Sequence, residues 1–328
     1  MKPTIALIGG FLGAGKTTLI LAAAELIQRR GANVAVVLND QGDDLVDTHL
    51  VQSHCVPADQ VAGGCFCCRF PDLVEALDRI SCCDPEVIFA EAVGSCTDIV
   101  ATTLRPLLRD YADRFRVAPL TVVLHPGAPF ADASLQFLDA NQQAEADLLV
   151  GWAPSLPRGA RRVNAATGEG VAEWLDEILA GAGPVAAHAL TLDYARYAEA
   201  EASLAWLNAR VTARAKPAIS PAMLVGPLLD RLSAAVPNIV HLKLLVQCDS
   251  GYLKAALTAS GGEPVVEGTL DASPSIDHEI LLNVRALADP MELRSIVERE
   301  FGKLPAEVKW ENVQCFRPAA PVPWQRVP

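Results

Sequence analysis

Two short segments of this chain combine residue types that can do chemistry. The first is GGFLGAGKTTL, residues 9–19, and the second is GGCFCCRF, residues 63–70. Glycines followed by a lysine and a threonine are typical of phosphate binding, whereas closely spaced cysteines are typical of binding a soft or borderline metal ion. The sequence therefore raises the question of why one chain carries both.

The first segment contains the pattern G-x-x-x-x-G-K-[ST] at residues 10–17, between an apolar stretch and a helical one. In this pattern backbone N–H groups surround the phosphates, the lysine reaches the β and γ oxygens, and the threonine hydroxyl binds Mg²⁺. We therefore predict that the chain binds a nucleoside triphosphate, with Mg²⁺ at Thr17. The predicted phosphate-binding residues are Gly10, Gly13, Ala14, Gly15, Lys16, Thr17 and Thr18.

Acidic residues follow two later apolar stretches. Glu91 ends the stretch EVIFAE, and Gly94 comes shortly after it with a backbone N–H that could approach the γ-phosphate. The loop predicted over residues 39–47 carries the carboxylates Asp40, Asp43, Asp44 and Asp47. Ligands of open parallel sheets lie at the carboxyl ends of the strands, so both segments can face the nucleotide. We predict Lys16, Asp40 and Glu91 as catalytic residues and Gly94 as a nucleotide contact.

The second segment contains a C-x-C-C motif formed by Cys65, Cys67 and Cys68, and the glycines before it let the backbone turn so that the sulfurs converge. We predict that these cysteines bind Zn²⁺ or another transition metal such as Co, Ni or Fe. A tetrahedral site then lacks one ligand, which suits a metal that is passed on. Candidates for that ligand are water, an aspartate from residues 40–47, His54, Cys55, Cys96 and a second subunit.

The remaining cysteines and histidines carry weaker signals. Burial is favoured over metal binding for Cys82, Cys83 and Cys96, because cysteine is often buried as a small apolar residue. Simple burial is also the alternative for the C-x-C-C cysteines. His125 is predicted to be a structural residue at the end of a strand.

The formal charge of −12 comes from 27 Lys and Arg against 39 Asp and Glu. Nucleic acids and anionic membranes bind basic surfaces, so this charge argues against a general affinity for either. No apolar run approaches the ~18 residues of a membrane span, and the start MKPTIALIGGF lacks a signal-peptide pattern. We expect a cytoplasmic protein, in which nine cysteines are poor disulfide candidates.

The elements that must position these residues alternate between apolar runs and helical patterns up to about residue 180, which is typical of a three-layer α/β domain with a mainly parallel sheet. The predicted strands are residues 4–9, 33–39, 86–92, 120–125, 146–152 and 161–166. The predicted helices are residues 16–30, 71–80 and 170–181.

The second half of the chain follows a segment of small, glycine- and proline-bearing residues at 181–189, which is typical of a linker. Its predicted elements are helices at residues 198–211 and 290–302 and strands at residues 241–247 and 279–287. We predict a P-loop NTPase domain over residues 1–182, a smaller α+β domain over residues 190–316 and an extended proline-rich tail over residues 317–328.

These motifs and their order resemble the CobW-type P-loop GTPases, nucleotide-driven metal chaperones of the SIMIBI class. The resemblance covers roughly residues 1–180 and includes the segments GGFLGAGKTTL, NDQGD, GGCFCC and EAVG. It implies that Cys65, Cys67 and Cys68 bind metal. It also implies that residues 40–47 and 91–94 are switch segments, and that GTP binding is coupled to metal handover.

One motif departs from this family. Where the family has N-K-x-D, this chain has ADLLVGWAPSL, which puts Trp152, Ala153 and Ser155 at the Asn, Lys and Asp positions. The family aspartate accepts two N–H bonds from guanine, each worth ~1.5–3 kcal/mol, and serine cannot replace it. We predict that Trp152 stacks on either purine, so that GTP and ATP both remain open.

We expect a metallochaperone or metalloenzyme activator that hydrolyses its nucleotide slowly, because no water-positioning glutamine follows Gly94 and only Gln41 is a candidate for that role. Its partner would be a client metalloprotein or a cofactor-dependent enzyme, and a homodimer is open. The alternatives are an activator of a corrinoid, nickel or iron enzyme, and a regulatory iron–sulfur or zinc protein without significant turnover. A small-molecule kinase is less favoured, because no acceptor pocket is recognised.

Overall fold

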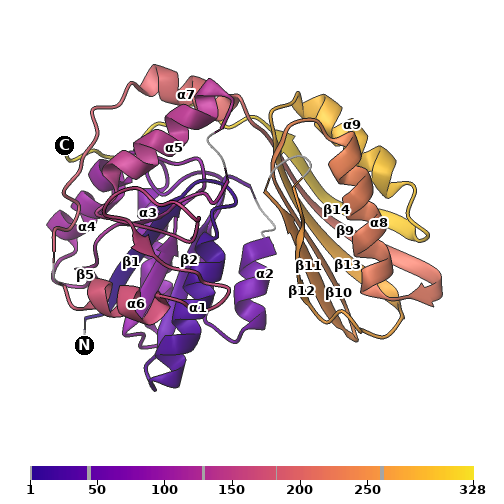
Figure 1. The fold of residues 1–328 in the computed structure, drawn as a ribbon, viewed down its shortest axis with the longest axis horizontal. Helices are drawn as coiled ribbons and strands as arrows, with labels where there is room; N and C mark the ends of the chain where they lie inside the picture. Colours follow the sequence, from indigo (N-terminus) through magenta and orange to yellow (C-terminus); the bar gives the residue numbers. More distant parts are fainter. Residues whose placement is uncertain (1, 43–45, 128–129, 182, 259–261) are drawn as a thin grey trace. The chain divides into compact units, whose positions relative to one another are not determined.

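The computed structural model describes residues 2–42, 46–127, 130–181, 183–258 and 262–328. The chain divides into two compact units (Figure 1). Unit 1 comprises Met1–Gln41, Asp47–Glu201 and Ala320–Pro328, and unit 2 comprises Gly42–Val46 and Ala202–Ala319. Within the described ranges, none of the helices combines the length and the apolar character that a membrane span needs.

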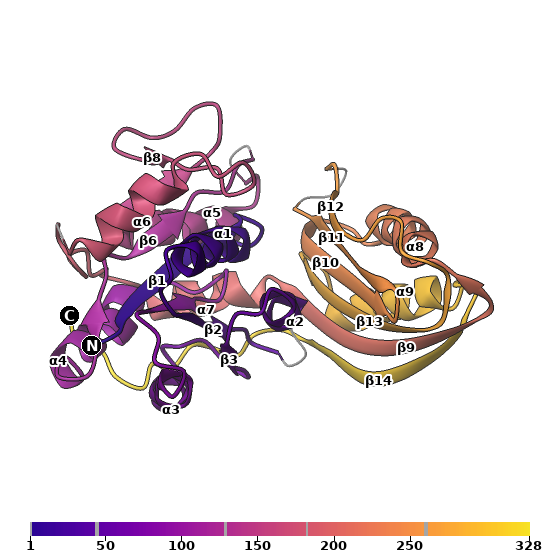
Figure 2. The ribbon, with the colours of Figure 1, turned by 90° about the horizontal axis from the view of Figure 1, so that it is seen from below.

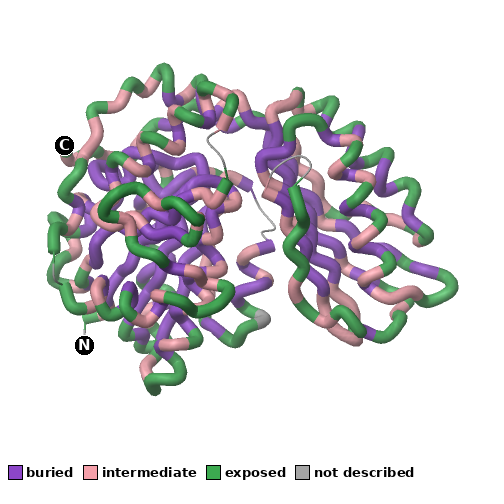
Figure 3. The backbone as a smooth tube through the Cα atoms, viewed as in Figure 1, coloured by how far each residue is buried: buried purple, intermediate pink, exposed green. Residues whose placement is uncertain are grey.

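Unit 1 is built on a sheet whose paired strands all run parallel, in the order β3-β2-β4-β1-β6-β7-β8, with β5 also paired to β1. The strands are β1 (Thr4–Gly10), β2 (Val34–Asn39), β3 (Ala58–Val61), β4 (Val87–Glu91), β5 (Arg116–Val117), β6 (Thr121–Val123), β7 (Leu148–Gly151) and β8 (Arg161–Arg162). Every residue of β1, β2 and β4 is buried, as the continuous apolar runs predict (Figure 3).

Helices cover both faces of this sheet. Figure 2 shows α1 (Lys16–Arg29) and α3 (Phe70–Ser81) on opposite sides of the strands. α6 (Val171–Leu179) packs in the same hydrophobic core as α1. In this core Trp174 of α6 stacks on Phe89 of β4, with 6.4 Å between the ring centroids. The remaining helices up to residue 202 are α2 (Val46–Ser53), the π-helix η1 (Val100–Leu104), α4 (Arg105–Asp110), α5 (Ala133–Glu145) and α7 (Tyr194–Ala202).

Sequence reasoning missed α2 and β3. Asp47 therefore lies in the first turn of α2 and not in a loop, at a helix N-terminus where the dipole favours a carboxylate. The predicted carboxylates Asp43 and Asp44 lie outside the described residues. The strand β3 has the sequence ADQV, whose two polar residues give no apolar run, and as an edge strand it is only partly buried.

Unit 2 is an antiparallel sheet in the order β12-β11-β10-β13-β9-β14, with helices α8 and α9 packed against its apolar face. The elements are β9 (Ala205–Ile219), α8 (Pro221–Ala235), β10 (Ile239–Cys248), β11 (Gly251–Leu257), β12 (Val265–Gly268), β13 (Ser275–Ala286), α9 (Pro290–Phe301) and β14 (Glu307–Phe316). The predicted fold class, a three-layer α/β domain with a smaller α+β domain, is confirmed.

The helix predicted over residues 198–211 is wrong beyond residue 202. α7 ends at Ala202, and the strand β9 begins at Ala205. The run contains Ala, Leu and Arg, which favour helix locally. It becomes a strand because β13 and β14 pair with it on both sides, and its inner and outer residues alternate from Ala209 to Ala215.

A buried acid joins α5 to the segment that follows β4. Glu145 accepts hydrogen bonds from the Thr97 hydroxyl (3.2 Å) and the Val100 N–H (3.1 Å). Burial is the main cause that raises the pKa of Glu145 to about 8. The protonated carboxyl therefore suits this position, and charging it costs stability.

The variant Glu145→Gln should make stability less dependent on pH. The pKa of Glu145 is raised in the fold from 4.5 to about 8, so its contribution is fully present below pH 4.5 and is lost as the pH rises toward 8. We expect wild type to be less stable to urea at pH 8 than at pH 5, and Glu145→Gln to show a smaller difference. The exposed Glu199 supplies the control Glu199→Gln. An unchanged pH dependence in Glu145→Gln would contradict this assignment.

Candidate nucleotide and metal site

The ends of three neighbouring strands bring the predicted site residues of unit 1 together. In the sheet, Glu91 at the end of β4 lies opposite Ile8 of β1 on one side and Leu38 of β2 on the other. The phosphate loop after β1 and the segment that starts at Asn39 therefore lie at the same sheet edge as Glu91. This edge is the usual ligand position in a parallel sheet.

The phosphate loop places a lysine and a threonine against this acid. The Lys16 ammonium donates to the carbonyl oxygens of Gly10 (2.9 Å) and Phe11 (3.3 Å) and lies 4.0 Å from a Glu91 carboxylate oxygen. The Thr17 hydroxyl donates to the same oxygen of Glu91 at 3.1 Å. All three side chains are buried. A hydroxyl beside a carboxylate is a ligand pair that suits Mg²⁺, and the lysine suits phosphate oxygens.

Two glycines make the close packing of this region possible. Gly10 has φ 131°, and a Cβ there would overlap the backbone carbonyl of Val123 in β6. A Cβ on Gly94 would lie 2.7 Å from Leu12 Cδ2 and 3.0 Å from Leu12 Cα. The segment after β4 therefore packs directly on the phosphate loop. The other predicted phosphate contacts, Gly13, Ala14, Gly15 and Thr18, lie in this loop and in the first turn of α1.

The three cysteines of the C-x-C-C motif form a compact group of sulfurs. The Cys65 thiol donates to Cys68 Sγ at 3.4 Å, and Cys67 Sγ lies 3.6 Å from Cys68 Sγ. Cys65 and Cys67 are buried, whereas Cys68 is half-buried. All three sulfurs lie within 4.8 Å of one another, and among the described residues they are the group found with metal-binding geometry. Sulfurs around one tetrahedral ion with metal–sulfur bonds of ~2.3 Å are about 3.8 Å apart, which fits this group.

Asn39 at the end of β2 holds the cysteine loop. Its side-chain amide donates to the carbonyl oxygens of Val61 (2.9 Å) and Gly64 (2.7 Å), and its oxygen accepts from the Phe66 N–H (2.8 Å). The next residue, Asp40, donates its backbone N–H to Val61 at 3.2 Å. Sequence reasoning missed Asn39, because a single asparagine before an acidic loop looks like an ordinary turn residue.

Cys96 joins the sulfur group from the segment after β4. Interaction with the thiols of Cys65 and Cys67 lowers the pKa of the buried Cys96 to about 6. Interaction with the thiols of Cys65, Cys68 and Cys96 raises the pKa of Cys67 well above its ordinary value. The prediction that Cys96 is buried is confirmed.

Other candidates for the fourth ligand lie elsewhere. His54 and Cys55 are exposed at the end of α2, where His54 Nδ1 is 2.9 Å from the Leu50 carbonyl oxygen. Cys82 and Cys83 are also exposed, because α3 ends at Ser81 and they follow it into a turn. The expectation that these two cysteines are buried is therefore wrong.

Three further side chains, far away in the sequence, fix the segment after Gly94. The Gln142 amide of α5 donates to the carbonyl oxygens of Gly94 and Cys96, both at 2.9 Å. The remaining two are Glu201 and Tyr197 of α7. No motif marks any of the three, so only the fold identifies them.

The buried Glu201 links the two predicted switch segments. One of its carboxylate oxygens accepts from the Ser95 hydroxyl (2.6 Å) and from the Gln41 amide (3.2 Å). The hydroxyl oxygen of Tyr197 accepts from the Thr97 N–H at 3.2 Å. Gln41, the candidate for positioning water, is thus engaged with Glu201 in this structure.

The segment 320–328 lies along the cysteine loop within unit 1. The Trp324 N–H donates to the Cys67 carbonyl oxygen at 2.8 Å. Arg326 donates through two nitrogens to Asp98, at 2.8 and 3.3 Å. The cysteine loop is therefore held from this side as well as from β2.

Residues 4–150 match the family model "CobW/HypB/UreG, nucleotide-binding domain". The matched residues lie within unit 1 and make up somewhat less than half of the chain. A curated relative, the Zinc chaperone YjiA of Escherichia coli (strain K12), is 38% identical over 79 residues, which are 24% of this chain and 24% of the relative. The match to this relative thus spans about a quarter of its length.

Solved structures resemble the chain more loosely. The Zn(II)-bound YjiA GTPase from E. coli is 12% identical, with a TM-score of 0.32 over 91% of this chain and 99% of that one. The hydrogenase maturation factor HypB from Archaeoglobus fulgidus is 17% identical, with a TM-score of 0.38 over 55% of this chain and 90% of that one. Likeness at this level does not extend to the details of a site.

The loop after β7, beyond the residues that match the family model, stands where the base-reading motif was expected. Trp152 is 46% exposed there. The Arg162 guanidinium donates to the backbone carbonyl oxygens of Trp152 (3.4 Å), Ala153 (3.3 Å) and Pro154 (3.4 Å). Arg162 therefore fixes the backbone conformation of this loop, while the Trp152 side chain stays partly exposed.

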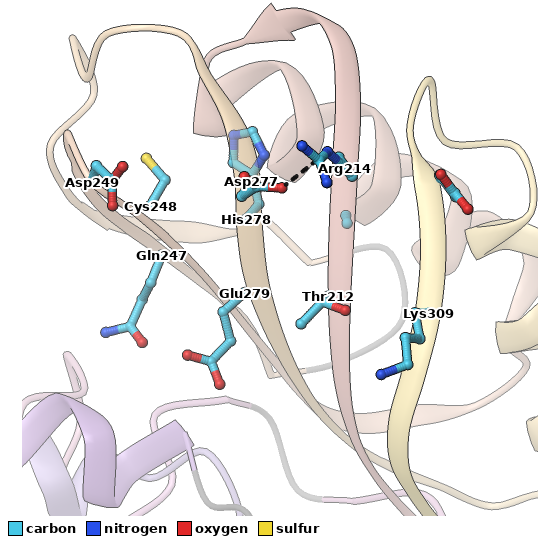
Figure 4. Close-up of a pocket in the computed structure, with 11 residues that line it drawn as sticks. Thr212, Arg214, Gln247, Cys248, Asp249, Asp277, His278, Glu279 and Lys309 are labelled. Atoms are coloured by element: carbon cyan, nitrogen blue, oxygen red, sulfur yellow. Dashed lines mark ion pairs between the residues drawn. The ribbon is translucent and has the colours of Figure 1, made fainter.

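Unit 2 contains a separate pocket of about 820 Å³ on its sheet (Figure 4). Charged side chains from β9, β13 and β14 line it, among them Arg214, which pairs with Asp277 at 3.6 Å. None of the residues predicted from the motifs lines this pocket. The predicted nucleotide-binding and metal-binding residues lie in unit 1.

The variant Asn39→Ala should loosen the cysteine loop. It leaves the Phe66 N–H and the Gly64 carbonyl oxygen without their Asn39 partner, while the Val61 oxygen keeps the Asp40 N–H, and a lost buried hydrogen bond costs ~1–3 kcal/mol. We expect lower stability to urea by about 1–3 kcal/mol and fewer thiols protected from a thiol reagent by Zn²⁺. The exposed Asn33, which donates to Asp84 at 3.2 Å, supplies the control Asn33→Ala. Unchanged thiol protection in Asn39→Ala would count against a role for Asn39 in shaping the site.

Proposed function

We propose that this protein is a nucleotide-dependent metallochaperone or metalloenzyme activator. In this proposal, binding and slow hydrolysis of Mg²⁺–GTP or Mg²⁺–ATP at the phosphate loop is coupled to binding and delivery of a transition metal at Cys65, Cys67 and Cys68. The observation that carries it is that the segments after β2 and β4 each contact the cysteine loop while lying at the nucleotide edge of the sheet.

The segment after β4 provides the more direct connection. Gly94 packs on Leu12 of the phosphate loop, and Cys96, only two residues later, interacts electrostatically with the thiols of Cys65 and Cys67. A γ-phosphate that accepts a hydrogen bond from the Gly94 N–H would therefore act on a segment that also touches the sulfurs. The buried hydrogen bonds from Gln142 make this segment move as a unit.

The segment after β2 provides the second connection. Asn39 holds the cysteine loop, and Asp40 directly follows it toward the predicted switch. Gln41 shares the Glu201 carboxylate with Ser95, so the two segments are also joined to each other. Coupling requires that the metal bind the two nucleotide states with different affinities, and this network offers the physical route.

The residues at the phosphate loop fit the proposed nucleotide. Thr17 and Glu91 would hold Mg²⁺, directly or through water, and Lys16 would leave the Gly10 and Phe11 carbonyls for the phosphate oxygens. When bound, Mg²⁺ would neutralise negative charge on the β- and γ-phosphate oxygens of the nucleotide. Because Gln41 is held by Glu201, it is not set to position water, which supports slow basal turnover.

The spacing of the sulfurs favours a single ion over an iron–sulfur cluster. Separations of 3.4 and 3.6 Å suit thiolates on one metal. Three cysteines of an iron–sulfur cluster bind at least two iron atoms, so their three sulfurs cannot all lie as close together as on one ion. Zn²⁺ is the first metal to test, because the relative YjiA is named a zinc chaperone. The half-buried Cys68 would pass the ion to a client metalloprotein or cofactor-dependent enzyme.

Calorimetry of nucleotide binding tests the coupling. We expect Zn²⁺ or Co²⁺ to change the affinity for GTP or ATP by about 5–150-fold, and the nucleotide to change the metal affinity by the same factor. Lys16→Ala should remove the nucleotide effect on metal binding, and Cys67→Ser should remove the metal effect on nucleotide binding. Equal affinities with and without metal would leave two unrelated sites and contradict the proposal.

The variant Trp152→Ala tests the base contact. Stacking on an aromatic ring contributes ~0.5–1.5 kcal/mol, so nucleotide affinity should fall by about 2–10-fold. Because either purine can stack, the loss should be similar for GTP and ATP. Trp324 is also exposed but lies beside the cysteine loop, where its backbone N–H donates to Cys67. It supplies the control Trp324→Ala. Undiminished affinity for both nucleotides in Trp152→Ala would exclude stacking.

A further inference from the structure

We propose that residues 320–328 form a clamp that joins the cysteine loop to the segment after β4 and carries the coupling between nucleotide and metal. In this proposal Arg326 is a positioning residue, because it acts on the metal site through its neighbours and does not touch the ion. The inference rests on the proposed function, since it requires that the phosphate loop binds nucleotide and that the C-x-C-C motif binds metal.

The clamp holds the cysteine loop at its middle cysteine. The Trp324 N–H donates to the Cys67 carbonyl oxygen at 2.8 Å. The backbone of Trp324 makes this bond, while its side chain is 66% exposed, so the bond does not need the ring. Pro321 and Pro323 precede this donor and restrict the backbone of the clamp. The contact therefore fixes the clamp against the backbone of a predicted metal ligand.

The other end of the clamp holds the segment after β4. The Arg326 guanidinium donates through two nitrogens to the two carboxylate oxygens of Asp98, at 2.8 and 3.3 Å. The Val327 N–H donates to the Ala101 carbonyl oxygen at 2.8 Å, within the π-helix η1. Inside unit 1, the clamp thus joins two segments that are far apart in the sequence.

Asp98 is placed to retain the arginine of the clamp. Its side chain is 1% exposed, and its carboxylate also accepts a hydrogen bond from the Tyr194 hydroxyl at 2.5 Å. A buried carboxylate needs a cation or several donors, so the loss of Arg326 would leave this one partly unsatisfied. The clamp is therefore held more firmly here than it would be by an exposed ion pair.

The segment that the clamp holds begins at the phosphate loop. Gly94 packs on Leu12, and the Gln142 amide donates to the Gly94 carbonyl oxygen at 2.9 Å. A displacement of Gly94 by a γ-phosphate would therefore reach Asp98, which lies four residues later. The clamp would pass this displacement to the backbone of the cysteine loop and change the metal affinity. Metal binding would act back on the nucleotide by the same factor.

Two substitutions at Trp324 test the contact with the cysteine loop. Trp324→Pro removes the N–H that Cys67 accepts, whereas Trp324→Ala keeps it. We expect calorimetry with Zn²⁺ and GTP or ATP to show a coupling factor that falls toward 1 in Trp324→Pro, by about 2–30-fold. The factor should keep its wild-type value in Trp324→Ala, and each ligand should still bind alone. Full coupling in Trp324→Pro would overturn the proposal.

The variant Arg326→Ala tests the contact with Asp98. It should also lower the coupling factor, and by more than Arg326→Lys, which keeps a cation beside Asp98. Arg30, which pairs with Asp176 at 2.6 Å beyond the end of α1 remote from the phosphate loop, supplies the control Arg30→Ala. If Arg326→Ala loses stability but keeps full coupling, the clamp only stabilises the fold and the proposal is overturned.

Amide hydrogen exchange of the wild-type protein tests the clamp without a substitution. We expect exchange in residues 324–327 to change when Zn²⁺ binds and again when the triphosphate binds, because both ligands act on the clamp. The same exchange in all ligand states would overturn the proposal. If the wild type shows no coupling between Zn²⁺ and nucleotide, the proposed function fails and this inference with it. If it shows coupling that Trp324→Pro and Arg326→Ala keep, only this inference fails.

Discussion

The packing of Gly94 on Leu12 is the contact on which the rest of the site depends. It brings the segment after β4 against the phosphate loop, at a distance that no side chain larger than hydrogen allows. Through Ser95 and Cys96 the same segment reaches the buried acid of α7 and the sulfur group. A change at the phosphate end therefore cannot stay local, because a packed interior moves between discrete arrangements.

Buried polar side chains keep these segments in defined positions. Asn39, Gln142, Glu145 and Glu201 each satisfy backbone or side-chain groups of the loops at the sheet edge. Leaving one such group without a partner costs ~1–3 kcal/mol, so a partly shifted loop is disfavoured. A network of this kind therefore favours fully bonded arrangements of these loops over partly shifted ones.

The sulfur group combines burial with access. Cys65, Cys67 and Cys96 are buried, which protects their thiols, while Cys68 is half-buried at the rim. The segment 320–328 covers the loop from outside through the Trp324 N–H and the ion pair between Arg326 and Asp98. The sulfur group is therefore closed on the buried side and partly accessible at Cys68.

The sequence by itself determined the phosphate loop, the C-x-C-C motif and the parallel sheet, because each depends on residues close together in the chain. It left out β3, whose polar residues give no apolar run, and misassigned β9, where pairing on both sides overrides helix propensity. Only the tertiary structure decided that Cys96, rather than His54 or Cys55, adjoins the motif, and that Asn39 and Glu201 hold the loops. These contacts join residues up to 160 positions apart, and their partners are set by strand order and helix packing, which local pattern does not encode.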